Sequence, residues 1–318
     1  MNNEFLVYID VVGGCNLKCP SCPMGNSRNL PRTKGLMEPA MLNRIMKKAV
    51  NECKVVSVGL FNWTEPLLHP RLSELVRVVR SHGVPCSIST NLSVNKSFDD
   101  LLEANPEAIY ISTSGFTQAV YERTHKGGDI ELVKRNMKIL AEESARCGGK
   151  THITVMFHRY RGNQQDEIYM RDFAKSLGFS FQTDHARMMP LEKTLAYIGH
   201  DLSMTQLTPD DYEILKLLPI PLDEAMEIAV QHKTQPCSFL SSQIVIDVLG
   251  EVQLCCAVYD SSKYGIGNYL NTPLHHIQGF RHSHPMCAKC RNAGGHVYAP
   301  ASAPEFEIMA VSNLAQPE

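Results

Sequence analysis

The sequence predicts an α/β fold: a partial barrel of six strand-and-helix units, followed by a small C-terminal domain with a β-hairpin. Short β-rich runs alternate with helical stretches from residue 5 to about residue 185. Strands that alternate with helices indicate βαβ units and a parallel sheet. Six such units would make an incomplete version of the eight-unit barrel, in which the C-terminal ends of the strands face the reaction space.

Each element of the barrel is predicted from local composition. Strands are expected at Leu6–Val11, Val55–Leu60, Cys86–Thr90, Ala108–Ser112, His152–Phe157 and Phe179–Gln182. Helices are expected between them, at Pro39–Glu52, Arg71–Ser81, Asp99–Leu102, Ile130–Arg146 and Glu167–Leu177. Pro39 stands where a first helical turn tolerates proline, and Gly83, Gly148 and Gly178 follow helix ends as C-terminal signals.

The pattern changes after residue 187, so we expect three segments. They are the barrel over 1–187, a linker or insertion over 188–235, and a C-terminal domain with its tail over 236–318. Prolines punctuate the linker, which we expect to be loop with two short helices, around Asp210–Leu218 and Asp223–His232.

The C-terminal segment contains a hairpin-like pair of β-rich runs. Gln243–Val248 and Val252–Cys255 are joined by Leu249-Gly250-Glu251, which can form a turn. The last fifteen residues carry few packing signals, and we expect them to be a loose tail.

Composition excludes several classes of protein. Lys and Arg number 31 against 33 Asp and Glu, a formal net charge of −2, whereas nonspecific binding to nucleic acid needs a basic surplus. Hydrophobic residues make up 43% and charged residues 20%, which is typical of a folded chain. No apolar run approaches the roughly 20 residues that span a bilayer, and the N-terminus lacks the pattern of a signal peptide. We therefore expect a cytoplasmic protein that binds neither nucleic acid nor a membrane.

The chain has 11 cysteines, an unusual number. A reducing compartment disfavours stable disulfides, so clustered cysteines indicate metal binding or reactivity. Two groups stand near the two ends of the chain: Cys15, Cys19 and Cys22, then Cys237, Cys255, Cys256, Cys287 and Cys290. The scattered Cys53, Cys86 and Cys147 are expected to be small packed hydrophobes.

The first group, Cys15-x3-Cys19-x2-Cys22, directly follows the first predicted strand. Three thiolates in one loop can hold three corners of an iron–sulfur cube, which leaves one iron open to a small molecule. The alternative is a structural zinc site, which needs four ligands. A fourth ligand is missing nearby, because the next cysteine is Cys53 and the first histidine is His69.

This run resembles the signature of the radical S-adenosylmethionine (radical SAM) superfamily, and the resemblance covers about residues 5–185. The segment Asn62-Trp63-Thr64-Glu65-Pro66 is similar to the family's Gly-Gly-Glu-Pro segment, which binds the amino group of the methionyl moiety. Ser89-Thr90-Asn91 looks like its Thr-Asn turn, and Ser112-Thr113-Ser114-Gly115 like its polar turn near the ribose. Asn163 matches a position that is often Asn in relatives with auxiliary clusters.

The resemblance implies a ligand set. A [4Fe–4S] cluster would bind to the first three cysteines, and S-adenosylmethionine (SAM) would contact Asn62, Thr64, Glu65, Asn91, Ser112, Ser114 and Asn163. The sequence departs from the family at Ser21, where an aromatic residue is frequent, and at Trp63-Thr64, which replaces two glycines. Adenine contacts from the Ser21 loop are therefore not assigned. The serines and Asn91 also fit ordinary turn capping.

The mechanism that the resemblance implies starts from a reduced cluster, which donates an electron to the sulfonium of SAM. Cleavage gives a 5′-deoxyadenosyl radical, which abstracts hydrogen from an unactivated carbon. The cofactors supply this chemistry, and the protein supplies position and excludes water and oxygen. A flavodoxin- or ferredoxin-type protein is implied as the reductant.

The second group places Cys237 and Cys255 around the predicted hairpin and Cys287 and Cys290 in a tight knuckle. Four cysteines can close a [4Fe–4S] or a zinc site. The pattern resembles the Twitch domain, the shorter relative of the SPASM domain, and implies one auxiliary [4Fe–4S] cluster, with structural zinc as the alternative. A full SPASM domain carries seven cysteines, more than this segment offers.

Several single residues have open interpretations. Cys256 is an alternate ligand, a packed hydrophobe, or a catalytic hydrogen-atom donor that would invert a carbon. Arg159, Asp184 and His185 follow the last predicted strands and either line a polar substrate pocket or form surface ion pairs. The histidines at 275, 276, 282 and 284 are expected to be surface or supporting groups and not metal ligands.

We weigh two main functions. The first is an enzyme that abstracts hydrogen from a small polar substrate in a biosynthetic pathway: a sugar, an aminocyclitol or a nucleoside-like molecule. Oxidation or epimerisation with help from the auxiliary cluster is the expected outcome, with decarboxylation or elimination as variants. The alternative is a maturase acting on a ribosomal peptide. Many such relatives carry an N-terminal winged-helix domain, for which we expect no room because the first strand begins by residue 6.

Two other classes are disfavoured. An electron carrier gains nothing from an open iron. A nucleic-acid-modifying enzyme is disfavoured by the neutral charge balance.

Overall fold

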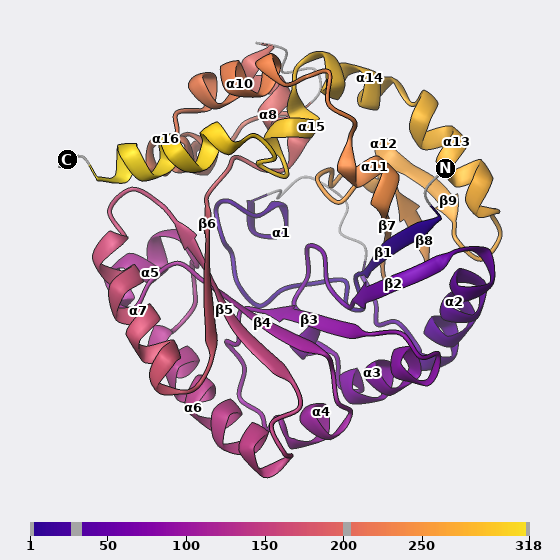
Figure 1. Cartoon of the computed structure of the whole chain (residues 1–318), viewed down its shortest axis with the longest axis vertical. Coiled ribbons are helices and arrows are strands. Elements are labelled where there is room, and N and C mark those ends of the chain that lie inside the picture. The colour runs from indigo at the N-terminus through magenta and orange to yellow at the C-terminus, as the bar shows by residue number, and fades with distance from the viewer. Residues whose placement is uncertain (1–2, 27–33, 200–204, 316–318) are drawn as a thin grey trace.

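A single sheet of nine strands organises the computed structural model, which describes residues 3–26, 34–199 and 205–315 (Figure 1). The strand order is β6-β5-β4-β3-β2-β1-β7-β8-β9. Pairing is parallel from β6 to β7 and antiparallel among β7, β8 and β9. The strands are β1 Glu4–Ile9, β2 Lys54–Gly59, β3 Cys86–Thr90, β4 Ala108–Thr113, β5 His152–Arg159, β6 Ser180–His185, β7 Gln243–Ile246, β8 Glu251–Gln253 and β9 Gly265–Asn268.

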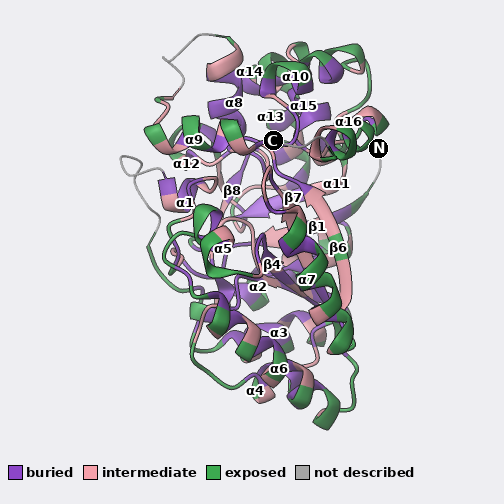
Figure 2. Ribbon diagram, turned by 90° about the vertical axis from the view of Figure 1, so that its left-hand side faces the viewer, coloured by how far each residue is buried: buried purple, intermediate pink, exposed green. Residues whose placement is uncertain are grey.

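Helices cover the outer face of the curved parallel sheet, so that their buried sides pack on the strands (Figures 1 and 2). They are α2 Pro39–Glu52, α3 Leu72–Ser81, α4 Asp99–Glu103, α5 Gln118–Thr124, α6 Ile130–Arg146 and α7 Gln164–Ser176. In α3 the buried residues are Leu72, Leu75, Val76 and Val79, a spacing that places them on one face of a helix. This apolar stripe fixes which side of α3 meets the sheet.

The structure confirms the predicted partial barrel. All six predicted strands are present as β1 to β6, and α2 has the predicted bounds, with Pro39 in its first turn. Gly83, Gly148 and Gly178 follow helices with positive φ angles of 73°, 86° and 75°, a conformation that glycine adopts without a steric penalty. Helix α5 was not predicted from the sequence.

The C-terminal strands continue the barrel sheet. Strand β7 pairs in parallel with β1, with Leu6 opposite Gln243, and the β7–β8 hairpin turns at Gly250, whose φ is 84°. The same hydrophobic core contains Val7 of β1 and Ile244 of β7. The segments expected as separate domains therefore share one sheet and one core, and the division at residues 187 and 235 stays a prediction.

Most helices that follow the barrel lie at the top and the right-hand side of Figure 1. The helices after the barrel are α8 Leu191–Ile198, α9 Pro209–Leu217, α10 Leu222–Gln231, α11 Ser238–Ser242, α12 Ser261–Tyr264, α13 Leu274–Ser283, α14 Pro285–Asn292, α15 Gly295–Tyr298 and α16 Pro304–Leu314. The two helices predicted in the linker are present as α9 and α10, and α8 was missed.

The expectation of a loose tail was wrong. Most of the last fifteen residues form α16, which buries Phe306 and Ala310 in a core that also contains Ile228 of α10 and Tyr298 of α15. Two apolar residues four positions apart are a weak signal in the sequence, and the helix is stabilised by neighbours that come from distant segments.

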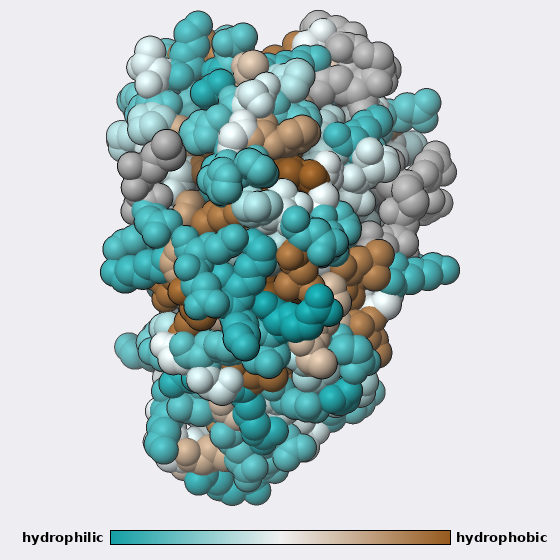
Figure 3. Space-filling model, turned by 90° about the vertical axis from the view of Figure 1, so that its right-hand side faces the viewer, coloured by the Kyte–Doolittle hydropathy of each residue, from teal (hydrophilic) through white to brown (hydrophobic). Residues whose placement is uncertain are grey.

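No helix in the described ranges is long and apolar enough to cross a membrane. On the face shown in Figure 3, hydrophilic residues predominate and hydrophobic residues gather in separate patches toward the middle. On this face the hydrophobic patches do not join into one continuous band.

Candidate active site

A cavity of about 380 Å³ lies at the C-terminal ends of the barrel strands. Because parallel strands end at one edge of the sheet, the loops that follow them converge there. Eight of the predicted cluster and cofactor ligands line this cavity: Cys15, Cys19, Cys22, Asn62, Thr64, Glu65, Asn91 and Ser112. Their predicted roles as ligands stay predictions, but the structure brings them together.

The first three cysteines lie in the loop between β1 and the short helix α1, Pro23–Asn26. The sulfur of Cys15 accepts hydrogen bonds from the backbone N–H of Leu17 at 3.5 Å and from the amide of Asn91 at 3.6 Å. A Cβ on Gly25 would lie 2.3 Å from the carbonyl oxygen of Cys19, so this tight loop requires glycine there. Burial raises the pKa of all three thiols, that of Cys15 to about 12.

Glu65 is fixed by three donors at the start of the 3-10 helix η1, Pro66–Leu68. Its carboxylate accepts from Leu67 N at 3.0 Å, Thr90 Oγ1 at 2.7 Å and Asn91 N at 2.8 Å. The residue is 2% exposed, and burial raises the pKa of the carboxyl. Glu65 thus joins the loops after β2 and β3 in one rigid wall of the cavity.

Asp10, which sequence reasoning missed, holds the neighbouring loop. Its carboxylate accepts hydrogen bonds from the backbone N–H groups of Asn62, Trp63 and Thr64 and, at 2.6 Å, from the hydroxyl of Thr64. Burial raises the pKa of Asp10 to about 6. The one signal in the sequence is an acidic residue directly after a buried strand. The loop therefore keeps its shape without the two glycines that the family pattern has.

Polar side chains from β4, β5 and the end of β6 form a second wall of the cavity. In the strand order these strands are the barrel strands farthest from β1, which the cysteine loop follows. Ser112 Oγ and His158 Nε2 are 3.0 Å apart, and Arg187 pairs with both carboxylate oxygens of Asp184, at 2.6 and 2.8 Å. Burial raises the pKa of Asp184, but the hydrogen bonds and charge of Arg187 outweigh it and lower the pKa overall. Burial lowers the pKa of His158 and, to about 3, that of His125 on the same cavity. Both imidazoles are therefore neutral at neutral pH.

Two predicted cofactor contacts lie outside the cavity wall. Ser114 bonds to His125 Nδ1 at 2.9 Å, and Asn163 donates to the carbonyl oxygens of Ser114 and His158, each at 2.9 Å. Asn163 therefore joins the ends of β4 and β5. Arg159 also does not line the cavity, because it pairs with Glu167 and Glu307, whereas Asp184 and His185 do line it.

Ser21 has a tyrosine beside it. The hydroxyl of Tyr160 donates to Ser21 Oγ at 3.2 Å, and both residues line the cavity. An aromatic ring thus lies at this part of the loop although it comes from the end of β5 and not from position 21 itself.

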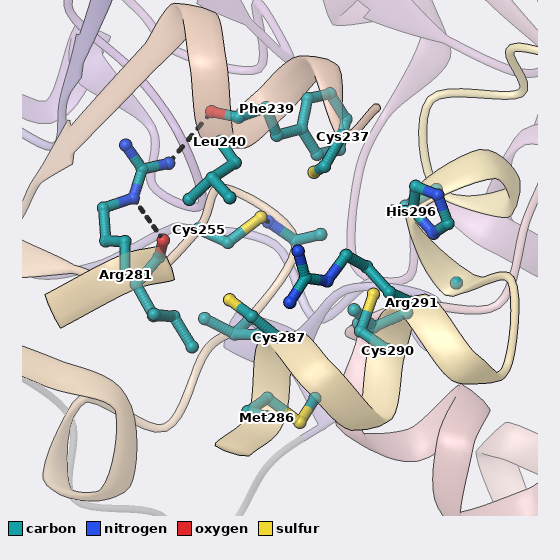
Figure 4. Close-up of a pocket in the computed structure, with 16 residues that line it drawn as sticks. Cys237, Phe239, Leu240, Cys255, Arg281, Met286, Cys287, Cys290, Arg291 and His296 are labelled. Atoms are coloured by element: carbon teal, nitrogen blue, oxygen red, sulfur yellow. Dashed lines mark hydrogen bonds between the residues drawn. The ribbon is translucent and has the colours of Figure 1, made fainter. Parts of the chain in front are cut away.

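The second set of cysteines lines a pocket of about 30 Å³ between α11, α14 and the loop after β8 (Figure 4). Cys237, Cys255, Cys287 and Cys290 surround this space, and the guanidinium of Arg291 lies among them. Arg291 is exposed, so its side chain is free to turn outward when a larger group binds. Burial raises the pKa of Cys287 to about 11 and also raises that of Cys237 and Cys290.

Arg281 braces this pocket. Its side chain is 2% exposed and donates to three carbonyl oxygens, those of Leu254 at 2.9 Å, Gln243 at 2.7 Å and Phe239 at 2.9 Å. Burial lowers its pKa. One cation thereby holds α11, β7 and the end of β8 around the thiols.

Cys256 does not line the barrel cavity or the pocket of the second cysteine set. A hydrogen bond from its thiol lowers the pKa of Cys255, and its own pKa is raised. The structure therefore places Cys256 beside a predicted ligand and away from the cavity wall. Among the described residues, no group of three or more His, Cys, Asp or Glu side chains is arranged to hold a single metal ion.

Comparison with known proteins agrees with this arrangement. A family model for the Radical SAM superfamily matches residues 9–167. A cysteine-type anaerobic sulfatase-maturating enzyme of Clostridium novyi is 25% identical over 287 residues, which cover 80% of this chain and 73% of that protein. A tungsten-containing aldehyde ferredoxin oxidoreductase cofactor-modifying protein of Pyrococcus furiosus is 28% identical over 110 residues, and the match spans only 30% of that protein.

Solved structures share the fold over nearly the whole chain. The AdoMet-bound structure of anSMEcpe has a TM-score of 0.58 at 19% identity and covers 98% of both chains. BtrN in complex with AdoMet and 2-DOIA has a TM-score of 0.54 at 16% identity and covers 93% of this chain and 90% of BtrN. The fold of the C-terminal region is similar to that of anSMEcpe and BtrN. The chain belongs to the radical SAM superfamily.

Proposed function

We propose that this radical SAM enzyme oxidises a hydroxyl-bearing carbon of a small polar substrate, a sugar, an aminocyclitol or a nucleoside-like molecule. The observation that carries the proposal is the composition of the barrel cavity. Three thiols lie in the loop after β1, and a charge-balanced polar wall lies at the ends of β4 to β6. The first suits a cofactor, and the second suits the hydroxyl groups of a substrate.

The residues present fit a SAM-binding [4Fe–4S] cluster. Cys15, Cys19 and Cys22 share one cavity with Glu65, and ligands spaced for a multi-iron cluster need not converge on one ion. When bound, cluster and SAM supply the one-electron chemistry that removes a hydrogen atom from carbon. The chain's own residues fix the cavity, because Asp10 and Glu65 each hold a neighbouring loop with several hydrogen bonds.

The polar wall supports a hydroxylated substrate. Ser112 and neutral His158 can exchange hydrogen bonds with hydroxyl groups, and Asp184 neutralises Arg187. A wall of this kind holds an uncharged polar molecule better than a polyanion, because among the described residues of this wall no unpaired cation faces the cavity. BtrN, solved with AdoMet and 2-DOIA, shares the fold and supports this assignment.

The four-cysteine pocket supports oxidation as the reaction. Converting an alcohol to a carbonyl removes a hydrogen atom from carbon, a proton from oxygen and one electron. The electron needs an acceptor, and we assign that role to an auxiliary [4Fe–4S] cluster on Cys237, Cys255, Cys287 and Cys290. Epimerisation through Cys256 has less support, because that thiol does not line the barrel cavity.

Peptide maturation is the second candidate. It is favoured by the match to the cysteine-type anaerobic sulfatase-maturating enzyme, which covers 80% of this chain. SuiB, solved with its precursor peptide, shares the fold at a TM-score of 0.60. The two candidates differ in substrate and agree on the cofactors.

Iron content tests the cofactor assignment. Anaerobic reconstitution should give about eight irons per chain if both cysteine sets hold cubane clusters. Cys19→Ser and Cys290→Ser should each bring the content toward about four, whereas Cys147→Ser, which lies in neither set, should leave it unchanged. About four irons in the unmodified chain would remove the auxiliary cluster from the proposal.

Deuterium transfer tests the substrate class. The reconstituted chain is incubated with reductant, SAM and a panel of carbon-deuterated sugars, aminocyclitols and nucleosides, or with carbon-deuterated cysteine-containing peptides. We expect deuterium in 5′-deoxyadenosine and a carbonyl product with one of the polyhydroxylated compounds. Transfer from a peptide alone would establish the second candidate instead.

A further inference from the structure

One side chain contacts both the barrel cavity and the loop of the second cysteine set. It belongs to Trp63, the single tryptophan of the chain. Trp63 lines the barrel cavity, and its indole Nε1–H donates to the carbonyl oxygen of Val258 at 3.2 Å. Val258 lines the pocket of the second set together with Cys255. The residue that replaces a family glycine is thus a hydrogen-bonded contact between the two sites.

A second contact runs beside the first. The hydroxyl of Tyr259 donates to the sulfur of Met24 at 3.0 Å, and Met24 follows Cys22 by two residues. The rings of Trp63 and Tyr259 meet edge to face, with centroids 6.3 Å apart. Both contacts therefore converge on one short segment, residues 257–259.

The first residue of this segment, Ala257, is hydrogen-bonded to a cysteine sulfur. The backbone N–H of Ala257 donates to Cys255 Sγ at 3.4 Å. Hydrogen bonds to the sulfur ligands of an iron–sulfur cluster help to set its reduction potential. A shift of residues 257–259 would therefore change the electronic environment of whatever Cys255 binds.

Both sides of the contact are held firmly. On the barrel side, Asp10 accepts from the backbone N–H of Trp63 at 3.1 Å. On the other side, Glu192 Oε1 accepts from the backbone N–H groups of Tyr259 at 2.7 Å and Asp260 at 3.1 Å. Because the interior is close-packed and both flanks are anchored, a displacement of the indole would be passed to Val258 and Ala257.

We propose that Trp63 is a positioning residue that couples the two cysteine sites. A ligand in the barrel cavity moves the indole, the indole moves residues 257–259 through the Val258 hydrogen bond, and the N–H···S bond on Cys255 changes with them. The inference rests on the proposed function, because it needs both clusters. It makes the auxiliary cluster responsive to occupancy of the barrel cavity.

The test is an EPR-monitored redox titration of the anaerobically reconstituted chain, with and without S-adenosylhomocysteine. This probe is not cleaved by reductant and carries no sulfonium charge, so a long-range charge effect is removed. The variant is Trp63→Phe, which keeps an aromatic ring and loses the N–H donor. The control is Tyr169→Phe, which alters an exposed ring on α7. Binding of the probe is verified by the change that it causes in the EPR signal of the SAM-binding cluster.

We expect the probe to shift the midpoint potential of the auxiliary cluster in the unmodified chain and in Tyr169→Phe. In Trp63→Phe the shift should disappear while iron stays at about eight per chain. An undiminished shift in Trp63→Phe, or no shift in the unmodified chain, would overturn the coupling. Loss of the auxiliary irons in Trp63→Phe would also overturn it, since the role would then be structural only.

Failure of the inference can be told apart from failure of the proposed function. An unmodified chain with about four irons would refute the auxiliary cluster itself, before any shift is measured. Fluorescence gives a second measurement, because Trp63 is the single tryptophan. Its emission should change when the probe binds, and unchanged emission would contradict its place on the cavity wall.

Discussion

A buried ion pair ties the segment 188–235 to the first cysteine loop and gives a quantitative prediction. Lys193 Nζ of α8 lies 2.9 and 3.0 Å from the carboxylate oxygens of Asp211 in α9, and the two side chains are 4% and 3% exposed. Asp211 also accepts from the amide of Asn26 at 2.8 Å, and that amide donates to Pro20 O at 2.7 Å. The pair therefore supports the loop that carries Cys19 and Cys22.

We predict that Lys193→Met is strongly destabilising, because it leaves the Asp211 carboxylate buried without its cation. Breaking a buried pair in this way costs about 3–5 kcal/mol. The entropy of unfolding is about 2.1 cal/mol/K per residue, or about 0.7 kcal/mol/K for 318 residues, so Tm should fall by about 4–8 °C. Thermal unfolding followed by circular dichroism measures this fall. Iron bound by the first cysteine set should decrease as well.

Two further variants make the prediction refutable. Lys216→Met removes an exposed pair with Glu213 and should change Tm by about 1 °C at most. Lys193→Met combined with Asp211→Asn should recover part of the loss, because no unpaired charge remains. A fall below about 2 °C for Lys193→Met, or one equal to that of Lys216→Met, would refute the reasoning.

Three other predictions concern Asp10 beside the barrel cavity, Arg281 beside the second set of cysteines, and Gly294, which packs against α10. Burial raises the pKa of Asp10 from 3.8 to about 6. The contribution of this group to stability is therefore full below about pH 4 and falls by about 3 kcal/mol as pH rises through 6. Plots of Tm against pH for Asp10→Asn and for the unmodified chain should diverge over that range, and parallel plots would contradict this. Arg281→Met removes one donor from each of three carbonyl oxygens, of which Phe239 O keeps the backbone N–H of Gln243; the loss at Leu254 O and Gln243 O should cost about 1–3 kcal/mol each, and bound iron should fall from about eight to about four. A full complement of iron with unchanged Tm would exclude the bracing role. Gly294 has a φ of 77° and a Cβ there would lie 2.7 Å from the backbone of Ala229, so Gly294→Ala should lower Tm by several degrees, whereas Gly279→Ala in open space should not.

The barrel could be predicted because its signals are local. The bounds of α2 follow from Pro39 and an apolar stripe within fourteen residues, and each barrel strand is a short β-rich run. Motifs that stand after successive strands, such as Cys15 and Glu65, could be expected on one cavity because parallel strands end at the same edge.

The rest depends on contacts between distant segments. Nothing near Asp10 shows that its carboxylate will meet the N–H groups of residues 62–64, and nothing near His158 shows that Ser112 will face it. The pairing of β7 with β1 likewise leaves no local pattern, because any exposed strand edge can accept a partner. Asn163 was placed by motif alone, and its hydrogen bonds turn out to join two strand ends.

The pairing of β1 with β7 also constrains the order in which the protein folds. Leu6 is paired with Gln243, so all six barrel strands, β1 to β6, are synthesised before the partner of one edge of β1 leaves the ribosome. Until then that edge is unpaired, and an unpaired strand edge invites association with other chains. Contacts between residues so distant in sequence also slow folding. A chain that stalls at this stage would expose the unpaired edge of β1, so late folding is a step that favours aggregation.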